Sequence, residues 1–208
     1  MHKLLVFLKR DCRLMSQSSH VVFLPLCYFL VSLFLIRLMM PSISGHILQL
    51  FWVLLVLSTL GTLGQTVAKD KEKGFLKAFQ KDQSLLLRYI LSKGICLSLF
   101  WILPYWGLYN GLAWGMGHEV PVGRSFIIFG CFLTPLAFLY ILFDTLVEGA
   151  RTSALLSLIL FAPFMIPLLI FASLSLSGEE GNTLPALLSY GTFLSLVAGF
   201  LAAHSLRA

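Results

Sequence analysis

Six long runs of apolar residues, separated by short polar stretches, constrain this chain more than any other feature of its sequence. The runs occupy residues 21–40, 45–66, 92–115, 125–147, 153–175 and 185–203. An α-helix needs about 20 predominantly apolar residues to cross the hydrocarbon core of a bilayer. The runs therefore predict an all-α integral membrane protein with six transmembrane helices. Because the chain has only 208 residues, we expect one transmembrane domain over residues 1–208 and no separate soluble catalytic domain.

The composition agrees with this prediction and argues against a water-soluble fold. Charged residues make up 12% of the chain, whereas soluble domains carry about 25%. Hydrophobic residues make up 58% of the chain. The first apolar run is longer than the core of a secretory signal peptide, so we expect it to be a retained membrane helix.

The positions of Lys and Arg predict how the six helices are oriented. Short loops that cross a membrane during insertion are depleted of these residues. With six spans, thirteen of the fifteen Lys and Arg residues lie on the side of the two termini, and only Arg37 and Arg124 lie on the other side. We therefore expect a multi-pass protein of the bacterial inner membrane with both termini in the cytoplasm. The net charge of +6 then reflects orientation and does not indicate nucleic-acid binding.

Residues 1–19 have the pattern of an amphipathic cytoplasmic helix. Leu8, Cys12 and Met15 fall on one arc of a helical wheel, and basic residues such as Lys9 and Arg13 fall on another. Such a helix lies at the membrane surface, with its basic side toward anionic lipid headgroups. An alternative is that the basic residues only anchor the N-terminus on the cytoplasmic side.

Residues 67–91 form the one sizeable polar loop, and we interpret this segment as a cytoplasmic coupling loop. Phe75, Leu76 and Phe79 share one face of a short predicted helix. Lys residues at 73, 77 and 81 line the other face. The apolar face predicts a helix-in-groove contact with a cytoplasmic partner, or alternatively a helix that lies on the membrane.

Two further groups of residues are candidates for function because of their place in the spans. Asp144 is near the cytoplasmic end of the fourth span, where an ion cluster with Glu148 and Arg151 is the structural interpretation and a proton or substrate role is the alternative. Aromatic residues lie at the outer end of the third span, where an aromatic belt at the membrane interface is expected. A sharper hypothesis is a surface for a flat aromatic ligand such as heme, formed by Trp101, Tyr105, Trp106 and His118.

The sequence has no motif for catalysis, stable cofactor binding or metal binding. It contains no G-x-S-x-G or H-E-x-x-H motif, and its four cysteines occur singly. We interpret these cysteines as isolated buried thiols. A Walker G-x-x-x-x-G-K-[ST] motif is also missing, so any ATPase must be another chain. We therefore do not expect an enzyme.

The fifth span resembles a known family. The stretch from Pro163 to Phe171 is similar to the P-x-x-I-P-L-L-I-F pattern of the CcmB family, the heme-exporter membrane proteins of cytochrome c maturation. Thr134-Pro135 and the loop pattern Asp70-x-x-x-Gly74-x-Leu76 are also similar to that family. The chain departs from it where members carry acidic residues in the loop, because Lys stands at positions 69, 73 and 77.

The resemblance implies a permease-type subunit of an ABC complex with an ABC-2-like fold. It implies a homodimer, a separate cytoplasmic ABC ATPase, a heme-handling membrane protein and a periplasmic heme chaperone as partners, with heme as a possible substrate. Two sets of residues acquire roles by this resemblance and by their positions. They are the ATPase-coupling residues Asp70, Gly74, Phe75, Leu76 and Phe79, and the helix-kinking motif residues Pro135, Pro163 and Pro167. Two alternatives are an ABC-2-type permease for another lipid or drug and a non-transporting membrane scaffold for the ATPase.

Overall fold

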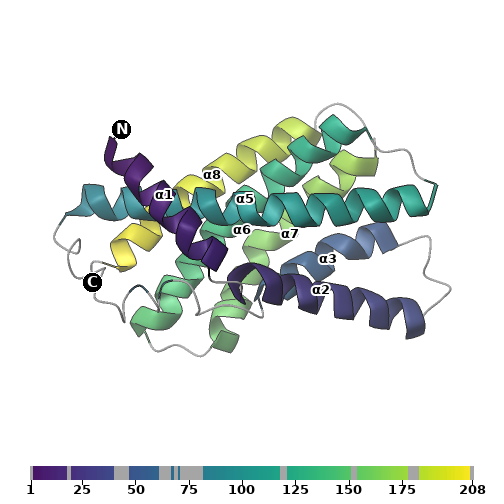
Figure 1. Cartoon of the computed structure of the whole chain (residues 1–208), viewed down its shortest axis with the longest axis horizontal. Coiled ribbons are helices and arrows are strands. Elements are labelled where there is room, and N and C mark those ends of the chain that lie inside the picture. Colours follow the sequence, from purple (N-terminus) through teal and green to yellow (C-terminus); the bar gives the residue numbers. More distant parts are fainter. Residues whose placement is uncertain are drawn as a thin grey trace.

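The computed structural model describes residues 2–17, 20–39, 47–60, 67, 70, 82–117, 121–150, 154–177 and 183–206. Within these residues the chain forms seven α-helices, which confirms the predicted all-helical class. The helices are α1 (His2–Gln17), α2 (His20–Met39), α3 (Ile47–Leu60), α5 (Gln83–Gly115), α6 (Val122–Ala150), α7 (Ala154–Ser177) and α8 (Thr183–Ser205). The start of α1 and the end of α8 lie toward the same end of the molecule as the start of α5 (Figure 1).

The helix α5 is longer than its predicted span, which begins at residue 92. It starts at Gln83 because Asp82 caps it, with a carboxylate that accepts hydrogen bonds from the backbone N–H groups of Ser84 and Leu85. Hydropathy alone does not locate this start, because Arg88 and Lys93 lower the mean hydropathy of the first turns of the helix. Residues 83–91 of the predicted coupling loop therefore belong to α5.

Three of the described helical segments are long and apolar enough to cross a membrane, by length and composition. They are Gln83–Gly115, Val122–Leu146 and Thr183–Ser205. Phe23–Met39, Leu50–Thr59 and Phe161–Leu176 are shorter apolar helical segments. These lengths are compatible with a membrane-embedded, multi-pass protein.

The helix α6 is the centre of the bundle. Every residue from Pro135 to Thr145 is buried, so this part of the helix is covered on all sides. Its neighbours include α5, α7 and α8. At the contact with α8, a Cβ atom on Gly191 would lie 3.0 Å from the carbonyl oxygen of Cys131 and 3.3 Å from the ring of Pro135. A small residue is therefore needed for α8 to approach α6 this closely.

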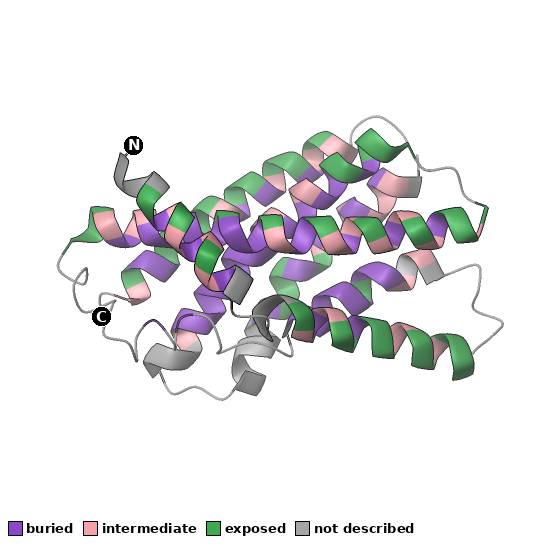
Figure 2. Ribbon diagram, in the orientation of Figure 1, coloured by how far each residue is buried: buried purple, intermediate pink, exposed green. Residues whose placement is uncertain are grey.

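The outer faces of α2 and α8 are apolar and exposed (Figure 2). On α2, Phe34 is 64% exposed and Leu38 is 66% exposed, and on α8 Phe193 is 64% exposed. Exposed apolar surface of this extent is unusual in a soluble monomer and normal for helices that face lipid.

An aromatic core fills the space where α2, α3, α5 and α6 meet. Its rings pack edge to face or tilted, at distances such as 4.7 Å between the centroids of Phe29 and Phe51 and 4.7 Å between those of Trp52 and Phe129. The members are Phe29, Phe51, Trp52, Tyr105, Tyr109, Phe129 and Phe132. This aromatic core holds the second half of α5 against the rest of the bundle.

Candidate functional site

A buried group of polar side chains joins α1, residue 70 and the first half of α5. We call it the polar junction, and it consists of Arg10, Asp11, Asp70, Tyr89, Ser92 and Lys93. Charged groups are rarely buried in proteins unless they are paired. The junction is therefore the most unusual polar feature of the described structure.

The centre of the junction is an ion pair between Lys93 and Asp70. Lys93 Nζ lies 2.6 Å from Asp70 Oδ2, and the two side chains are only 6% and 11% exposed. The Tyr89 hydroxyl donates to the same carboxylate oxygen at 2.6 Å, and Lys93 Nζ donates to the Tyr89 oxygen at 2.8 Å. Asp70 is thus held against α5 by two side chains, Tyr89 and Lys93, that also bond to each other.

The helix α1 contributes an arginine and an aspartate to the junction. Arg10 lies 3.1 Å from Asp11 Oδ1 and 3.4 Å from Asp70 Oδ1. Asp11 Oδ2 accepts a hydrogen bond of 2.9 Å from the hydroxyl of Ser92 on α5. The guanidinium of Arg10 also lies 5.9 Å from the centroid of the Tyr89 ring. The junction therefore connects α1 both to α5 and to residue 70.

The two carboxylates of the junction have pKa values shifted in opposite directions. Burial raises the pKa of Asp11, and this effect exceeds the opposing influence of the Arg10 charge and the Ser92 hydrogen bond. Burial acts in the same direction on Asp70, but the charge and hydrogen bonds of Lys93 and Tyr89 lower its pKa below the usual range. Asp70 is consequently the better stabilised anion.

The spacing of residues along α1 explains why this helix packs against α5. Phe7, Asp11 and Met15 are each four residues apart and are buried on one face, while Lys9 and Arg13 are exposed. The predicted N-terminal helix is present, and Met15, with Leu8 and Cys12 beside it, packs into the hydrophobic core of the protein. The apolar arc expected to face the membrane thus contacts protein at these positions.

The other residues proposed to couple the chain to an ATPase, Gly74, Phe75, Leu76 and Phe79, lie outside the described residues, as does His118. Asp70 alone of the coupling set is described. It is buried in the junction and does not lie on an exposed helix face.

The aromatic residues predicted to form a ligand surface lie in different surroundings. Trp101 is fully buried with its ring 5.3 Å from that of Tyr140, and Tyr105 is 1% exposed. The Tyr105 hydroxyl is 3.1 Å from the hydroxyl of Ser58. Trp106 is half-buried and donates its indole N–H to Ser125 at 3.1 Å. The structure thus places Trp101 and Tyr105 inside the bundle, where they present no surface to a flat ligand.

The three motif prolines lie within helices. Pro135 is in α6, and Pro163 and Pro167 are in α7. A proline at 135 cannot bond the carbonyl of Cys131, and this carbonyl is the group that Gly191 approaches. In α7, the carbonyl of Phe164 accepts a hydrogen bond of 3.2 Å from the hydroxyl of Tyr190 on α8. Both helices are therefore contacted by α8 close to a proline.

Asp144 makes a second connection between the bundle and the segment that precedes α5. Its Oδ2 atom accepts a hydrogen bond of 2.6 Å from the backbone N–H of Val67. The side chains of its predicted partners Glu148 and Arg151 lie outside the described residues. Residues 67 and 70 are thus both fixed to helices of the bundle.

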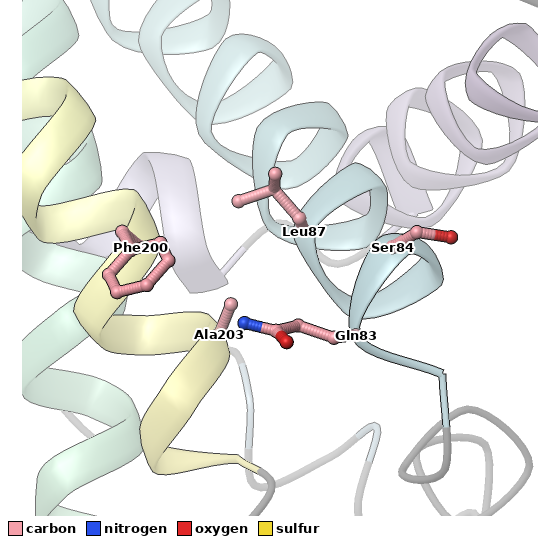
Figure 3. A pocket seen from close by; sticks show the side chains of 5 residues that line it. All are labelled: Gln83, Ser84, Leu87, Phe200 and Ala203. Carbon is pink, nitrogen blue, oxygen red and sulfur yellow. The ribbon is translucent and has the colours of Figure 1, made fainter.

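A hollow of about 330 Å³ lies between the start of α5 and the end of α8 (Figure 3). It is lined by Gln83, Ser84, Leu87, Phe200 and Ala203. None of these five described side chains is charged, in contrast to the polar junction on α5.

Sequence reasoning finds Asp70 but misses its partners. It treats Lys93 only as a cytoplasmic charge and gives Asp11 no role. One signal is present, because Asp11 is the only acidic residue before Asp70 in a segment rich in Lys and Arg. Tyr89 and Lys93 are four residues apart, which places them on one helix face.

Among the described residues, no group of three or more His, Cys, Asp or Glu side chains is arranged to hold a metal ion. Comparison of the sequence with models of known families and with curated proteins gives no match.

Proposed function

We propose that this chain is the permease-type membrane subunit of an ABC transporter complex that serves heme export or delivery in c-type cytochrome biogenesis. In this proposal its six apolar segments cross the bacterial inner membrane and both termini are cytoplasmic. Two copies pair, and a separate cytoplasmic ATPase supplies the energy. A heme-handling membrane protein and a periplasmic heme chaperone are the further partners.

The observation that carries this proposal is the buried anchoring of Asp70. This residue belongs to the loop that resembles the family pattern, and it is paired with Lys93 on α5 and lies 3.4 Å from Arg10 on α1. A buried ion pair resists separation because each charge left alone is poorly solvated. Movement of the loop by a partner would therefore move α1 and α5 with it.

The heme-linked function is favoured over transport of another lipid or drug by the resemblance of the fifth span. That stretch lies in α7, and Tyr190 of α8 binds the carbonyl of Phe164 within it. A scaffold without transport would need the loop but would not depend on the two prolines of α7.

The coupling role can be tested by copurification of the ATPase from membranes. We expect the triple variant F75S/L76S/F79S to release the ATPase, because a polar face no longer fits an apolar groove. The control variant F75L/L76I/F79L keeps the face apolar and should retain it. Equal copurification with both variants, at equal amounts of the chain in the membrane, would sink the coupling role.

The substrate class is tested by the content of c-type cytochromes in a deletion strain. We expect this content to fall and to be restored by the wild-type chain, but not by P163A/P167A. A normal content of c-type cytochromes in the deletion strain would overturn the heme-linked function. Transport of another substrate would then be the remaining transport function. Full restoration by P163A/P167A would favour the scaffold.

A further inference from the structure

Two of the cysteines lie in contact across the interface between α1 and α5. The sulfur atoms of Cys12 and Cys96 are 2.8 Å apart, although the residues are 84 positions apart in the sequence. Cys96 is buried, and its Sγ also lies 3.5 Å from the carbonyl oxygen of Leu8, one turn earlier on α1. Cys12 is only partly buried. The interpretation of the cysteines as isolated thiols is therefore wrong for this pair.

The polar junction lies next to the two cysteines and keeps their helices in contact. Asp11 precedes Cys12, and its carboxylate accepts a hydrogen bond from Ser92, one turn before Cys96 on α5. A disulfide has a sulfur–sulfur distance of about 2.05 Å, so closure requires a movement of less than about 1 Å. Cys27 is exposed on α2 and Cys131 is partly buried on α6, and both are free thiols.

We infer that Cys12 and Cys96 form an intramolecular disulfide when the protein meets a two-electron thiol oxidant. The more accessible Cys12 is the attacking group, and its thiolate forms a covalent adduct with the oxidant. The thiolate of Cys96 then displaces the reduced oxidant from Cys12 and forms the S–S bond. The two electrons and two protons pass to the oxidant, which is a disulfide, a quinone or a diazene.

The disulfide would fix α1 to α5 covalently. In the dithiol form these helices are held next to the pair by reversible contacts, such as the Asp11–Ser92 hydrogen bond. In the proposed topology both sulfurs lie toward the cytoplasm, where thiols are kept reduced. The dithiol is then the resting form, and the disulfide forms only under oxidative stress. The chemistry itself does not depend on the proposed transport function.

The test counts free thiols of the full-length protein in membranes before and after treatment with the diazene oxidant diamide. After oxidation the protein is denatured, and the remaining thiols are labelled with a maleimide polymer that shifts the band on a gel. We expect the wild type to fall from four labels to two and the C27S/C131S variant to fall from two to none. Reduction with dithiothreitol should restore both. The matched variants C12S and C96S should each retain all three labels.

A second measurement identifies the bond in the wild-type chain. Trypsin would release Cys12 in the tripeptide Asp11–Arg13 and Cys96 in the peptide Gly94–Arg124. Mass spectrometry after oxidation should find these two peptides joined. Retention of both labels by C27S/C131S after oxidation would overturn the inference. Loss of labels accompanied by a dimer band on a non-reducing gel, without the joined peptides from the monomer, would overturn it as well.

Discussion

The helix α5 passes through two regions that hold it in different ways. Its first half lies in the polar junction, where Lys93 Nζ pairs with the Asp70 carboxylate at 2.6 Å. Its second half lies in the aromatic core, where Tyr109 contacts Phe51, Trp52 and Phe129 at centroid distances of 5.2 to 6.2 Å. A few strong polar pairs hold the first half of α5, and many weak aromatic contacts hold the second half. The first half is therefore sensitive to the loss of a single partner, and the second half is tolerant of it.

The largest effect should come from Lys93→Met. This change leaves Asp70 buried without its cationic partner on α5, and breaking a buried pair costs about 3–5 kcal/mol. The free energy of unfolding in detergent micelles measures the loss. Lys9→Met on the exposed face of α1 is the control and should have little effect.

Adding Asp70→Leu to Lys93→Met should recover part of that loss, because the buried carboxylate that has lost Lys93 is then removed as well. A double variant as unstable as the sum of the two single variants would show that the pair is not coupled. That result would contradict the idea that the first half of α5 is more sensitive than the second half to the loss of a single partner.

A smaller effect is expected from Tyr105→Phe in the aromatic half. The variant loses the hydroxyl near Ser58, but the Ser58 hydroxyl still donates to the carbonyl of Leu55 at 2.8 Å. The Ser58 donor therefore stays satisfied, so the cost should be about 1 kcal/mol. The same unfolding measurement applies. A loss equal to that of Lys93→Met would contradict the tolerance of this half.

The smallest effect should be the change in pH dependence caused by Asp11→Asn. The pKa of Asp11 is raised in the folded state, so its contribution to stability is present below the unfolded value of 3.8 and is lost as pH rises through the folded pKa. The lowered pKa of Asp70 acts oppositely: its contribution is present above 3.8 and is lost as pH falls through the folded pKa.

The free energy of unfolding, measured from pH 3 to pH 7, separates the two carboxylates. Asn at position 11 can still accept the hydrogen bond from Ser92, so this variant should lack the decline above pH 3.8 and be no less stable than the wild type at pH 7. Asp70→Asn should be less stable at pH 7. A decline above pH 3.8 that persists in the Asp11→Asn variant would exclude Asp11 as its source.

The helices are largely predictable from apolar run length, because burial in lipid or protein demands continuous apolar sequence. The predicted spans 125–147 and 153–175 lie within α6 and α7 or differ from them by one residue at the start. Hydropathy misses the start of α5 because the first turns of this helix carry charge that is typical of a loop. The capping residue Asp82 is the local signal that could place it.

The candidate site is less predictable, because its partners are far apart in the sequence. A motif points to Asp70, but the contacts of this residue with Arg10 and Lys93 span 60 and 23 residues. The contact between Cys12 and Cys96 has the same origin, since it exists only because α1 folds back across α5. Periodicity identifies which residues share a face of one helix, and it does not identify the neighbouring helix.

Because α5 is long, a small rotation at one end would displace its other end by several Å. Its 33 residues extend for about 50 Å, whereas the hydrocarbon core of a bilayer is about 30 Å thick. Trp114 lies about 30 Å beyond Lys93 along the same helix. A rotation of α5 by about 10° around the junction would therefore displace Trp114 by about 5 Å. A rearrangement of the ion pair that tilted α5 by this amount would therefore move the far end of the helix by about the length of one helix turn.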